Sequence, residues 1–400
     1  MATISPAPGG MKENRTAHPY HMYDAIRLQP SLIAGLLRTH RAEIDRAADA
    51  AAACQRLIFA GIGTSGHAAQ LGGYFLRLLT AGRLAPLFEQ SFELVNYPLA
   101  LGPGDALIAT SHRGWKNFSV EAVRRAKAAG ALTIAITGEG GGEGIRAADF
   151  VFPTCEQEIS FAHTKSYTTA LAVLAALAIR IAEQRNLLSD AAAARAALER
   201  IPDAITSVFA SEPQARSAAK AIAARQRLIF VGAGPNSITA REAALKVKET
   251  SYVAAEGFET EEFLHGPLSE MDSRAALVAF LSGGPADDRA RQVLAAVGEL
   301  GVARVTVCVA GKPSTSATSS SGALAAPAGS SSGPLAEHSL GALTERVIEV
   351  PAVPEWLSPF PQTVAAQPLC YFLALERGAN PDWGREDQPD HARSRQHFKL

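Results

Sequence analysis

The stretch RLIFAGIGTSGHAAQ, residues 56–70, returns in altered form as RLIFVGAGPNSITAR, residues 227–241. Each copy begins with a short apolar run, passes through a glycine turn and continues into a segment of helical composition. An apolar run that ends in glycines before a helix is typical of a buried strand in a parallel α/β unit. The recurrence therefore predicts that the chain contains two copies of one α/β fold.

Further strand and helix patterns follow each copy in the same order. In the first half the apolar runs 106–114 and 131–138 are separated by a helical stretch, and in the second half the runs 275–284 and 303–311 are separated in the same way. Strands that alternate with helices form βαβ units, whose strands lie parallel and whose helices cover both faces of the sheet. We predict an α/β protein of two tandem domains, each a flavodoxin-like parallel sheet flanked by helices.

Connecting segments set the expected domain boundaries. Residues 24–53 are helical in composition, with an expected interruption at Pro30, and residues 167–201 are predicted to form one long helical connection. Residues 312–339 are rich in Ser, Ala, Gly and Pro, which predicts a disordered insertion. We expect a mobile N-terminal tail, a first domain, a second domain and a C-terminal tail, with the bounds 1–22, 23–195, 196–375 and 376–400.

Composition narrows the classes of partner. Of the 400 residues, 47% are hydrophobic and 19% charged, and the net charge is −1, so neither nucleic acid nor a membrane is an expected partner. No apolar run reaches the ~18 residues that span a bilayer, and the N-terminus lacks the apolar core of a signal peptide, so a cytoplasmic protein is expected. No metal site or disulfide framework is indicated, because the four cysteines lie far apart: Cys54, Cys155, Cys308 and Cys370.

The glycine turn of the first copy suits an anion. Gly61 and Gly63 permit a sharp turn after the strand, and Thr64 and Ser65 place hydroxyls and amides at the start of the next helix. A helix N-terminus attracts negative charge, so the turn fits a phosphate, although any βα unit can need such a turn. The turn has neither the P-loop lysine pattern nor the full GxGxxG fingerprint, which disfavours a nucleotide ligand.

A second turn in the same half is strongly polar. The segment SHRGWKN, residues 111–117, ends the next predicted strand and supplies Ser111, His112, Arg113 and Lys116. Hydroxyl, guanidinium and ammonium donors fit an anion, and a solvated loop is the alternative. The corresponding turns of the second copy carry no comparable set of donors. The first copy is therefore the expected anion site.

The second copy carries ionisable residues at helical spacing. Glu242, Lys246 and Glu249 are spaced i, i+4 and i+7, so they share one face of a helix. The pattern alone leaves two interpretations, a surface stripe of salt bridges or a set of catalytic groups. His265 stands just before a Gly-Pro pair, in a loop position that can serve function or structure.

Taken together, these motifs resemble a known family. They comprise GTS after the first strand, SHRG after the second, EISFAHTKSYTT from Glu158 to Thr169, EAALKVKETSY, E-x-x-HGPL and a near-terminal DQP. The combination resembles the double sugar-isomerase (SIS) domain family from about Tyr23 onward. The closest likeness is to the isomerase half of glutamine:fructose-6-phosphate aminotransferase.

The resemblance implies where a substrate binds. In the family the GTS turn and the serine-rich second turn hold a sugar phosphate, and no cofactor is involved. Carried onto this chain, the expected substrate-binding residues are Gly63, Thr64, Ser65, Ser111, His112, Arg113, Lys116 and His163.

The resemblance also implies catalytic roles. Glu249 matches the base that moves a proton between C1 and C2, and Lys246 and Glu242 match residues that line the same site. His265 matches a histidine that helps to open the sugar ring and reaches across from a partner subunit, so a homodimer is implied. The C-terminal tail is expected to reach the active site.

Two positions depart from the family pattern. The family's second turn reads Ser-Gln-Ser-Gly-Glu-Thr, whereas Arg113, Trp115 and Lys116 bring charge and bulk here, so the phosphate is held more strongly or the ligand differs. The family's C-terminal catalytic lysine aligns near Ser394, which lies between two arginines, and Lys399 is the only lysine nearby. Because arginine forms no Schiff base, imine chemistry at that position is in question.

The family's glutaminase domain, with its N-terminal cysteine nucleophile, is not expected in this chain, where Ala2 follows Met1. The expected function is a phosphosugar aldose–ketose isomerase or an aminosugar-phosphate deaminase that acts on a hexose or hexosamine 6-phosphate, with Glu249 as base. One alternative is a sensor that binds a phosphosugar without converting it. Another is the isomerase subunit of a glucosamine-6-phosphate synthase that takes ammonia from a separate glutaminase.

Overall fold

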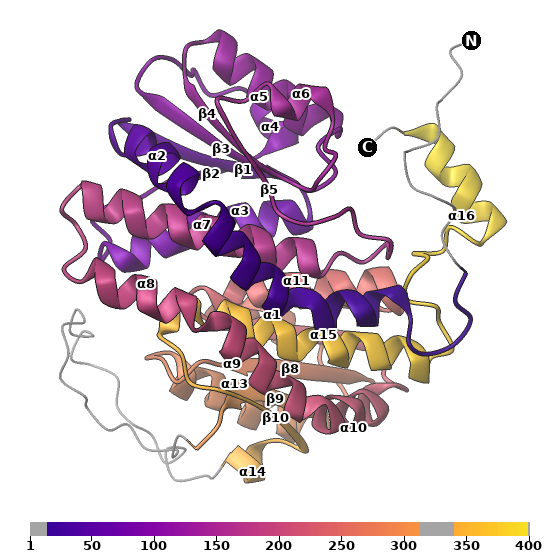
Figure 1. The fold of residues 1–400 in the computed structure, drawn as a ribbon. Coiled ribbons are helices and arrows are strands. Elements are labelled where there is room, and N and C mark those ends of the chain that lie inside the picture. Colours follow the sequence, from indigo (N-terminus) through magenta and orange to yellow (C-terminus); the bar gives the residue numbers. More distant parts are fainter. Residues whose placement is uncertain (1–13, 312–339, 399–400) are drawn as a thin grey trace.

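The computed structural model describes residues 14–311 and 340–398. The predicted insertion at 312–339, Lys399 and the first part of the predicted N-terminal tail lie outside the described residues. In Figure 1 one sheet lies at the top of the view and another at the bottom, with long helices between them. The chain thus forms two α/β units, as predicted.

The first unit is built on a five-stranded parallel sheet with the order β2-β1-β3-β4-β5. Its strands are β1 (Arg56–Gly61), β2 (Leu87–Gln90), β3 (Asp105–Ser111), β4 (Leu132–Thr137) and β5 (Phe150–Pro153). Numbered along the chain, this order is 2-1-3-4-5, the order of flavodoxin-like folds. Residue 56 pairs with residue 105, so the turns after β1 and β3 emerge at the same edge.

The second unit repeats this sheet, with the order β10-β9-β8-β6-β7 and all strands parallel. Its strands are β6 (Arg227–Gly232), β7 (Ala254–Glu259), β8 (Ala275–Leu281), β9 (Ala303–Val309) and β10 (Arg346–Val350). When these five strands are numbered from 1 to 5 along the chain, their order in the sheet is again 2-1-3-4-5. The shared order confirms the predicted duplication and fold class.

Sequence pattern found the three central strands of each sheet and missed the strands at both edges. The missed strands are β2, β5, β7 and β10. Strand β2 has no buried position, and β5, β7 and β10 mix buried positions with exposed or half-exposed ones, whereas β3 and β8 are buried along their whole length. A half-exposed strand lacks the continuous apolar run by which a buried strand is recognised.

Helices cover both sheets. Those of the N-terminal half are α1 (His21–Thr39), α2 (Arg41–Ala52), α3 (Thr64–Leu79), α4 (Ser91–Asn96), α5 (Asn117–Ala128), α6 (Glu143–Arg146) and α7 (Lys165–Gln184). Those that follow are α8 (Ala191–Glu199), α9 (Ile201–Val208), α10 (Glu212–Ile222), α11 (Asn236–Thr250), α12 (Thr260–Leu264), α13 (Asp287–Glu299), α14 (Leu340–Leu343), α15 (Pro359–Glu376) and α16 (Pro389–Ser394).

The first helix runs through Pro30, so the predicted interruption there is wrong. A proline inside a helix leaves the carbonyl four residues earlier without its backbone donor. Here Gln29 Nε2 donates to the Ile26 carbonyl at 2.8 Å and supplies the missing donor. The break between α1 and α2 falls instead at His40.

The predicted continuous helix over residues 167–201 is also wrong. Helix α7 ends at Gln184, and Asn186 adopts a positive φ of 55°, a conformation that stops a helix. A new helix, α8, begins after Asp190, whose side chain accepts a hydrogen bond from the Ala193 amide at 2.8 Å. Alanine-rich composition concealed these two local signals.

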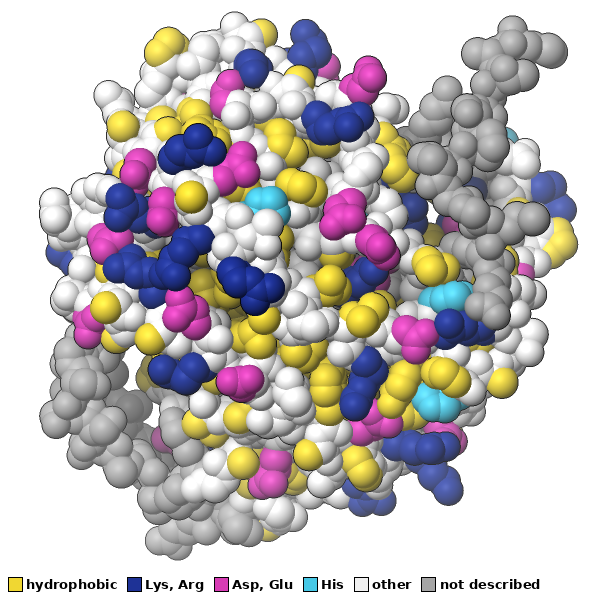
Figure 2. Space-filling view, in the orientation of Figure 1, with side chains coloured by type: hydrophobic (Ala, Val, Ile, Leu, Met, Phe, Trp, Pro, Cys, Tyr) yellow, Lys and Arg dark blue, Asp and Glu magenta, His cyan; other side chains and the backbone are white. Residues whose placement is uncertain are grey.

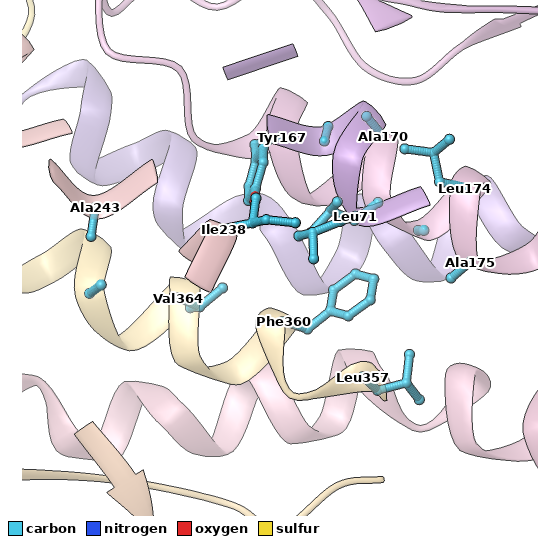
Figure 3. Packing of buried hydrophobic residues seen from close by; sticks show 14 of the residues in the cluster. Leu71, Tyr167, Ala170, Leu174, Ala175, Ile238, Ala243, Leu357, Phe360 and Val364 are labelled. Carbon is cyan, nitrogen blue, oxygen red and sulfur yellow. The ribbon is translucent and has the colours of Figure 1, made fainter. Parts of the chain in front are cut away.

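One hydrophobic cluster joins the two units. Helices α3 and α7 of the first unit pack near α11 and α15 of the second, and their apolar side chains meet in the middle of the molecule (Figure 3). Leu71 and Tyr167 lie there with Ile238, Phe360 and Val364. Burial of each large apolar side chain stabilises the fold by about 1.5–3 kcal/mol. The cluster therefore holds α3 against α11, and each of these helices carries some of the predicted site residues.

One face of the molecule carries charges of both signs. On the face shown in Figure 2, acidic and basic side chains are interspersed. Among the described helices, α7 has the length and hydropathy of a membrane span, but 83% of its apolar window is buried inside the protein. That degree of burial is typical of the core helix of a globular fold.

Candidate active site

A cavity of about 450 Å³ opens at the carboxyl ends of β1 and β3. The strand order reverses at β1, and ligands of parallel α/β sheets bind in the crevice that this reversal creates. Residues from the first unit, from α11 and from the C-terminal segment line the cavity: Ile62, Gly63, Thr64, Ser65, Ser111, His112, Arg113, Trp115, Lys116, Ser119, Phe161, His163, Leu245, Glu249, Glu386 and Arg395. The cavity brings together all eight predicted substrate-binding residues and Glu249.

The first turn has the tight geometry that its glycines predict. A Cβ on Gly61 would lie 2.5 Å from the Ser65 carbonyl oxygen, so no larger residue fits there. Gly63 has φ 58° and ψ −134°, and α3 begins at Thr64 directly after it. The amides at the start of this helix therefore point toward the cavity end of the sheet, as an anion requires.

The second turn is held by a buried histidine. His112 is buried and its Nε2 lies 3.2 Å from the Glu158 amide, which donates to it. Burial, with smaller contributions from Arg113 and Lys165, lowers the pKa of His112 to about 3. The neutral ring meets His163 edge to face, with 5.0 Å between the ring centroids. His112 thus shapes the turn and carries no charge near neutral pH.

Glu158, the first residue of the EISFAHTKSYTT segment, organises the wall behind this turn. Its buried carboxylate accepts hydrogen bonds from the Thr164 amide at 2.7 Å and from the Ser166 amide and hydroxyl at 2.8 and 2.7 Å. These bonds satisfy amide donors at the start of α7. They also fix the loop that carries His163 into the cavity wall.

Two cations of the second turn face the cavity, and neither has an ion-pair partner among the described residues. Neither Arg113 nor Lys116 makes an ion pair or hydrogen bond with another described residue, although Arg113 lies over the Trp115 ring at 5.8 Å. Burial and the neighbouring Arg113 charge lower the pKa of Lys116. Two positive groups that form no ion pair with a described residue, in one cavity, favour an anionic ligand.

The ionisable face of α11 is buried, which rules out the surface stripe of salt bridges. The side chains of Glu242 and Lys246 are each 2% exposed, and that of Glu249 is 20% exposed. Lys246 Nζ lies 2.5 Å from Glu249 Oε2 and 3.3 Å from Glu242 Oε1. Both carboxylates therefore contact the same buried ammonium.

Helix α3 completes this cluster from the opposite unit. Thr64 Oγ1 accepts from Lys246 Nζ at 3.0 Å and donates to Glu242 Oε1 at 3.0 Å. His67 Nδ1 lies 2.6 Å from Glu242 Oε2. Sequence analysis did not single out His67. Its spacing of three residues from Thr64 places both on one helix face, but nothing local shows that this face meets α11.

The two carboxylates differ in proton affinity. Burial raises the pKa of Glu242, but the Lys246 ammonium and the hydrogen bonds from His67 and Thr64 outweigh it, so this pKa is lowered. Burial also raises the pKa of Glu249, and there the attraction of Lys246 is not enough to offset it. Paired carboxylates whose pKa values are pushed apart are typical of acid–base sites.

The C-terminal segment contributes a wall of the cavity. Arg395 Nη1 contacts Glu386 Oε1 at 2.6 Å, Nη2 donates to the Gly384 carbonyl at 2.8 Å, and the guanidinium lies 4.6 Å from the Phe161 ring centroid. The neighbours Arg393 and Ser394 are exposed. The basic residue that reaches the cavity here is therefore an arginine, and Glu386 and Phe161 join it as cavity residues that sequence analysis did not name.

His265 lies apart from the cavity of its own chain. Its side chain is 73% exposed at the end of α12, where Nε2 lies 3.1 Å from Glu261 Oε1. It is not among the residues that line the cavity. Its expected role at the site of a partner subunit stays a prediction.

The described residues contain no group of three or more His, Cys, Asp or Glu side chains placed to hold a metal ion. The four cysteines are free thiols, three of them buried.

Comparison with known families fits this arrangement. The sequence model of the SIS domain matches residues 52–180 and 221–344, one match in each unit. The chain belongs to the SIS domain family. Its two SIS domains face each other through α3 and α11, and the cavity lies where they meet.

Curated relatives of this SIS protein are glutamine–fructose-6-phosphate aminotransferases [isomerizing]. The enzyme of Thermococcus kodakarensis is 27% identical over 372 residues, which cover 92% of this chain and 57% of the relative. That of Pyrococcus horikoshii is 29% identical over 367 residues, 91% of this chain and 56% of the relative. The chain thus spans about half the length of the curated relatives it matches.

Solved structures show the same fold. The C-terminal domain of glucosamine-fructose-6-phosphate aminotransferase from Francisella tularensis superposes with a TM-score of 0.76 at 21% identity, over 92% of this chain and 99% of that one. Tagatose-6-phosphate ketose/aldose isomerase from Escherichia coli gives 0.69 at 21%, over 93% and 96%. Glucosamine-6-phosphate deaminase from Thermotoga maritima gives 0.65 at 17%, over 91% and 97%. The named relatives of this SIS protein are aminotransferases, an isomerase and a deaminase of sugar phosphates.

Proposed function

We propose that this SIS protein binds a hexose or hexosamine 6-phosphate and moves a proton between C1 and C2, with Glu249 as the base. The observation that carries the proposal is the position of Glu249 in the cavity wall, with a raised pKa and with the buried Lys246 beside it. A base with a raised pKa both takes and returns a proton near neutral pH, which an aldose–ketose shift requires.

The remaining groups suit the other demands of that reaction. The turns at Thr64–Ser65 and Ser111–Lys116 offer amides, hydroxyls and two cations to a phosphate. Oxyanion character develops on the carbonyl oxygen as the enediol forms, and donors held in the cavity wall stabilise it. If the substrate carries a 2-amino group, the same proton transfer yields an imine, which water converts to a ketone with release of ammonia.

We also propose a cytoplasmic homodimer in which His265 enters the cavity of the partner subunit. The exposed position of His265, outside its own cavity, supports this. Mixing inactive His265→Asn with inactive Glu249→Gln tests it, because mixed dimers regain one intact cavity if His265 is shared between copies. Recovery of part of the activity is expected, and none is expected if each chain works alone.

The central test follows deuterium exchange at C1 and C2, and ammonia release, in deuterated water with a panel of hexose and hexosamine 6-phosphates. Exchange without ammonia identifies an isomerase, and exchange with ammonia a deaminase. Glu249→Gln should slow exchange by about 10²–10⁴-fold while ligand-induced thermal stabilisation persists. Stabilisation without exchange in the unmodified protein would indicate a phosphosugar sensor.

The ammonia-dependent transferase remains a second candidate because the curated relatives are aminotransferases over the matched half. It predicts formation of glucosamine 6-phosphate from fructose 6-phosphate and ammonium, and co-purification with a separate glutaminase. Failure of ammonium to support amination would remove it.

A further inference from the structure

His67 stands behind the ionisable cluster and outside the cavity. It lies on the first turn of α3 with 18% of its side chain exposed, and it does not line the cavity. We propose that His67 is a positioning residue that controls the protonation of Glu249 through Glu242 and Lys246. The inference rests on the proposed function, since it concerns the same base.

The hydrogen bond to Glu242 defines the tautomer of His67. A carboxylate whose pKa is lowered only accepts hydrogen bonds, so the proton of the 2.6 Å bond belongs to Nδ1 of His67. Nε2 makes no hydrogen bond with another residue in the described part of the chain. His67 can therefore gain a second proton at Nε2 without losing its bond to Glu242.

The contacts then form a continuous path to the base. Glu242 Oε2 receives the bond from His67, while Glu242 Oε1 contacts Lys246 Nζ at 3.3 Å. Lys246 Nζ in turn contacts Glu249 Oε2 at 2.5 Å. Because both carboxylates compete for one ammonium, a strong donor on Glu242 leaves Lys246 free to stabilise the ionised form of Glu249.

The net charge of the buried cluster gives the direction in which His67 affects the protonation of Glu249. With a cationic His67, the set of His67, Glu242, Lys246 and Glu249 is neutral when Glu249 is ionised. With a neutral His67 and with Glu242 ionised, as its lowered pKa favours, the set is neutral only when Glu249 holds a proton. A buried cluster favours neutrality, so proton uptake by His67 favours proton release from Glu249.

Other ionisable groups face this cluster from neighbouring elements, namely Lys116, Glu158, His163, Tyr167, Arg241 and Cys370. Burial raises the pKa values of Tyr167 and Cys370 and lowers that of His163, so these three are uncharged near neutral pH. Lys116, Glu158 and Arg241 are present in the unmodified protein and in the His67 variants alike. Their influence on Glu249 is therefore common to both sides of the comparison.

The test replaces His67 by Asn and by Gln, which keep an N–H donor but cannot gain a proton. Carboxyl-carbon NMR of glutamate-labelled full-length protein, with the Glu249 signal assigned through Glu249→Gln, should show the pKa of Glu249 raised by about half to one unit. The acid limb of the rate profile for the exchange reaction should move to higher pH by the same amount. KM should stay unchanged, because His67 does not line the cavity.

His40→Gln is the matched control. His40 is 20% exposed and lies 3.7 Å from Glu43, so it resembles His67 in burial and charge partner but is not part of the cluster. It should leave both the titration of Glu249 and the rate profile unchanged. An unchanged Glu249 titration in a folded His67 variant overturns the inference and leaves the proposed function standing.

A measurement on the unmodified protein keeps the inference testable if the variants fail to fold. Imidazole-nitrogen NMR should show the ring proton of His67 on Nδ1, and an Nε2–H tautomer near neutral pH would overturn the inference. A shifted Glu249 titration in a protein that exchanges no substrate proton would support the coupling and contradict the proposed function instead.

Discussion

Lys246 Nζ lies 2.5 Å from Glu249 Oε2, yet the pKa of Glu249 is raised and not lowered. An ammonium this close ordinarily favours the ionised carboxylate. Here burial opposes the ionisation of Glu249. Glu242 Oε1 also contacts the Lys246 ammonium, at 3.3 Å, and competes for its charge. Glu249 is therefore a buried proton acceptor whose negative charge Lys246 compensates only in part, and it stands in the cavity wall.

Ser65 and Thr64 should respond differently to truncation. Ser65 Oγ lines the cavity and accepts a 3.5 Å hydrogen bond from the His112 amide, whereas Thr64 Oγ1 bonds to both Lys246 and Glu242. Ser65→Ala should raise KM several-fold, about 1 kcal/mol of binding, with kcat little changed. Thr64→Ala should lower kcat as well. Steady-state kinetics compare the two, and indistinguishable profiles would contradict this division.

Arg113→Gln should weaken binding of the anionic substrate by about tenfold and reduce its dependence on ionic strength. The reason is that Arg113 faces the cavity without a counter-ion among the described residues. Calorimetric titration at low and high salt measures both effects. Arg124→Gln, on a 65% exposed side chain paired with Glu121, is the control and should change neither.

Glu249→Gln should stabilise the fold near neutral pH. Since burial raises the folded-state pKa of Glu249 above its unfolded value, the stability associated with the protonated form is present in full below about pH 4 and is lost as pH rises through the folded-state pKa. The amide mimics the protonated form and avoids that loss. Scanning calorimetry should show a midpoint higher by about 1–3 °C at pH 7–8, with the difference fading toward pH 4. Equal midpoints across that range would contradict the raised pKa.

Asp382 should anchor the C-terminal segment. Its side chain is buried and accepts hydrogen bonds from the His21 and Met22 amides at 2.8 and 2.9 Å, at the start of α1. Asp382→Ala should lower the free energy of unfolding by about 1–2 kcal/mol, because it removes a helix cap. Limited proteolysis should then cut more readily near Glu386. Asp390→Ala, on an 86% exposed side chain, should do neither.

Most of the fold could be predicted from the sequence because its central strands have distinctive local patterns. Strands β1 and β6 repeat one pattern, and β3 and β8 are continuously apolar. The edge strands could not be predicted, because their half-exposed positions give no clear hydrophobic periodicity. The path of α1 through Pro30 depends on a side-chain donor, Gln29, that no propensity scale includes.

The candidate site could be predicted from the sequence only in part. The glycine turn, the charged second turn and the spacing of Glu242, Lys246 and Glu249 all stand in the sequence. Whether that helix face was a solvated stripe or a buried cluster could not be decided from spacing, which is the same for both. The participation of His67 and Glu386 had no local signal, whereas Arg395 stands beside the position where the family resemblance expects a basic residue.

The sequence by itself determined the duplicated α/β fold and the chemistry of the turns, because strand burial, glycine conformation and helical spacing are properties of neighbouring residues. The tertiary structure alone decided that α3 lies against α11. That packing joins His67 to Glu242, 175 positions later, and takes the Glu-Lys-Glu face out of water. The pKa values of these carboxylates follow from the burial and from the partners it imposes, and neither is encoded in any short stretch of the chain.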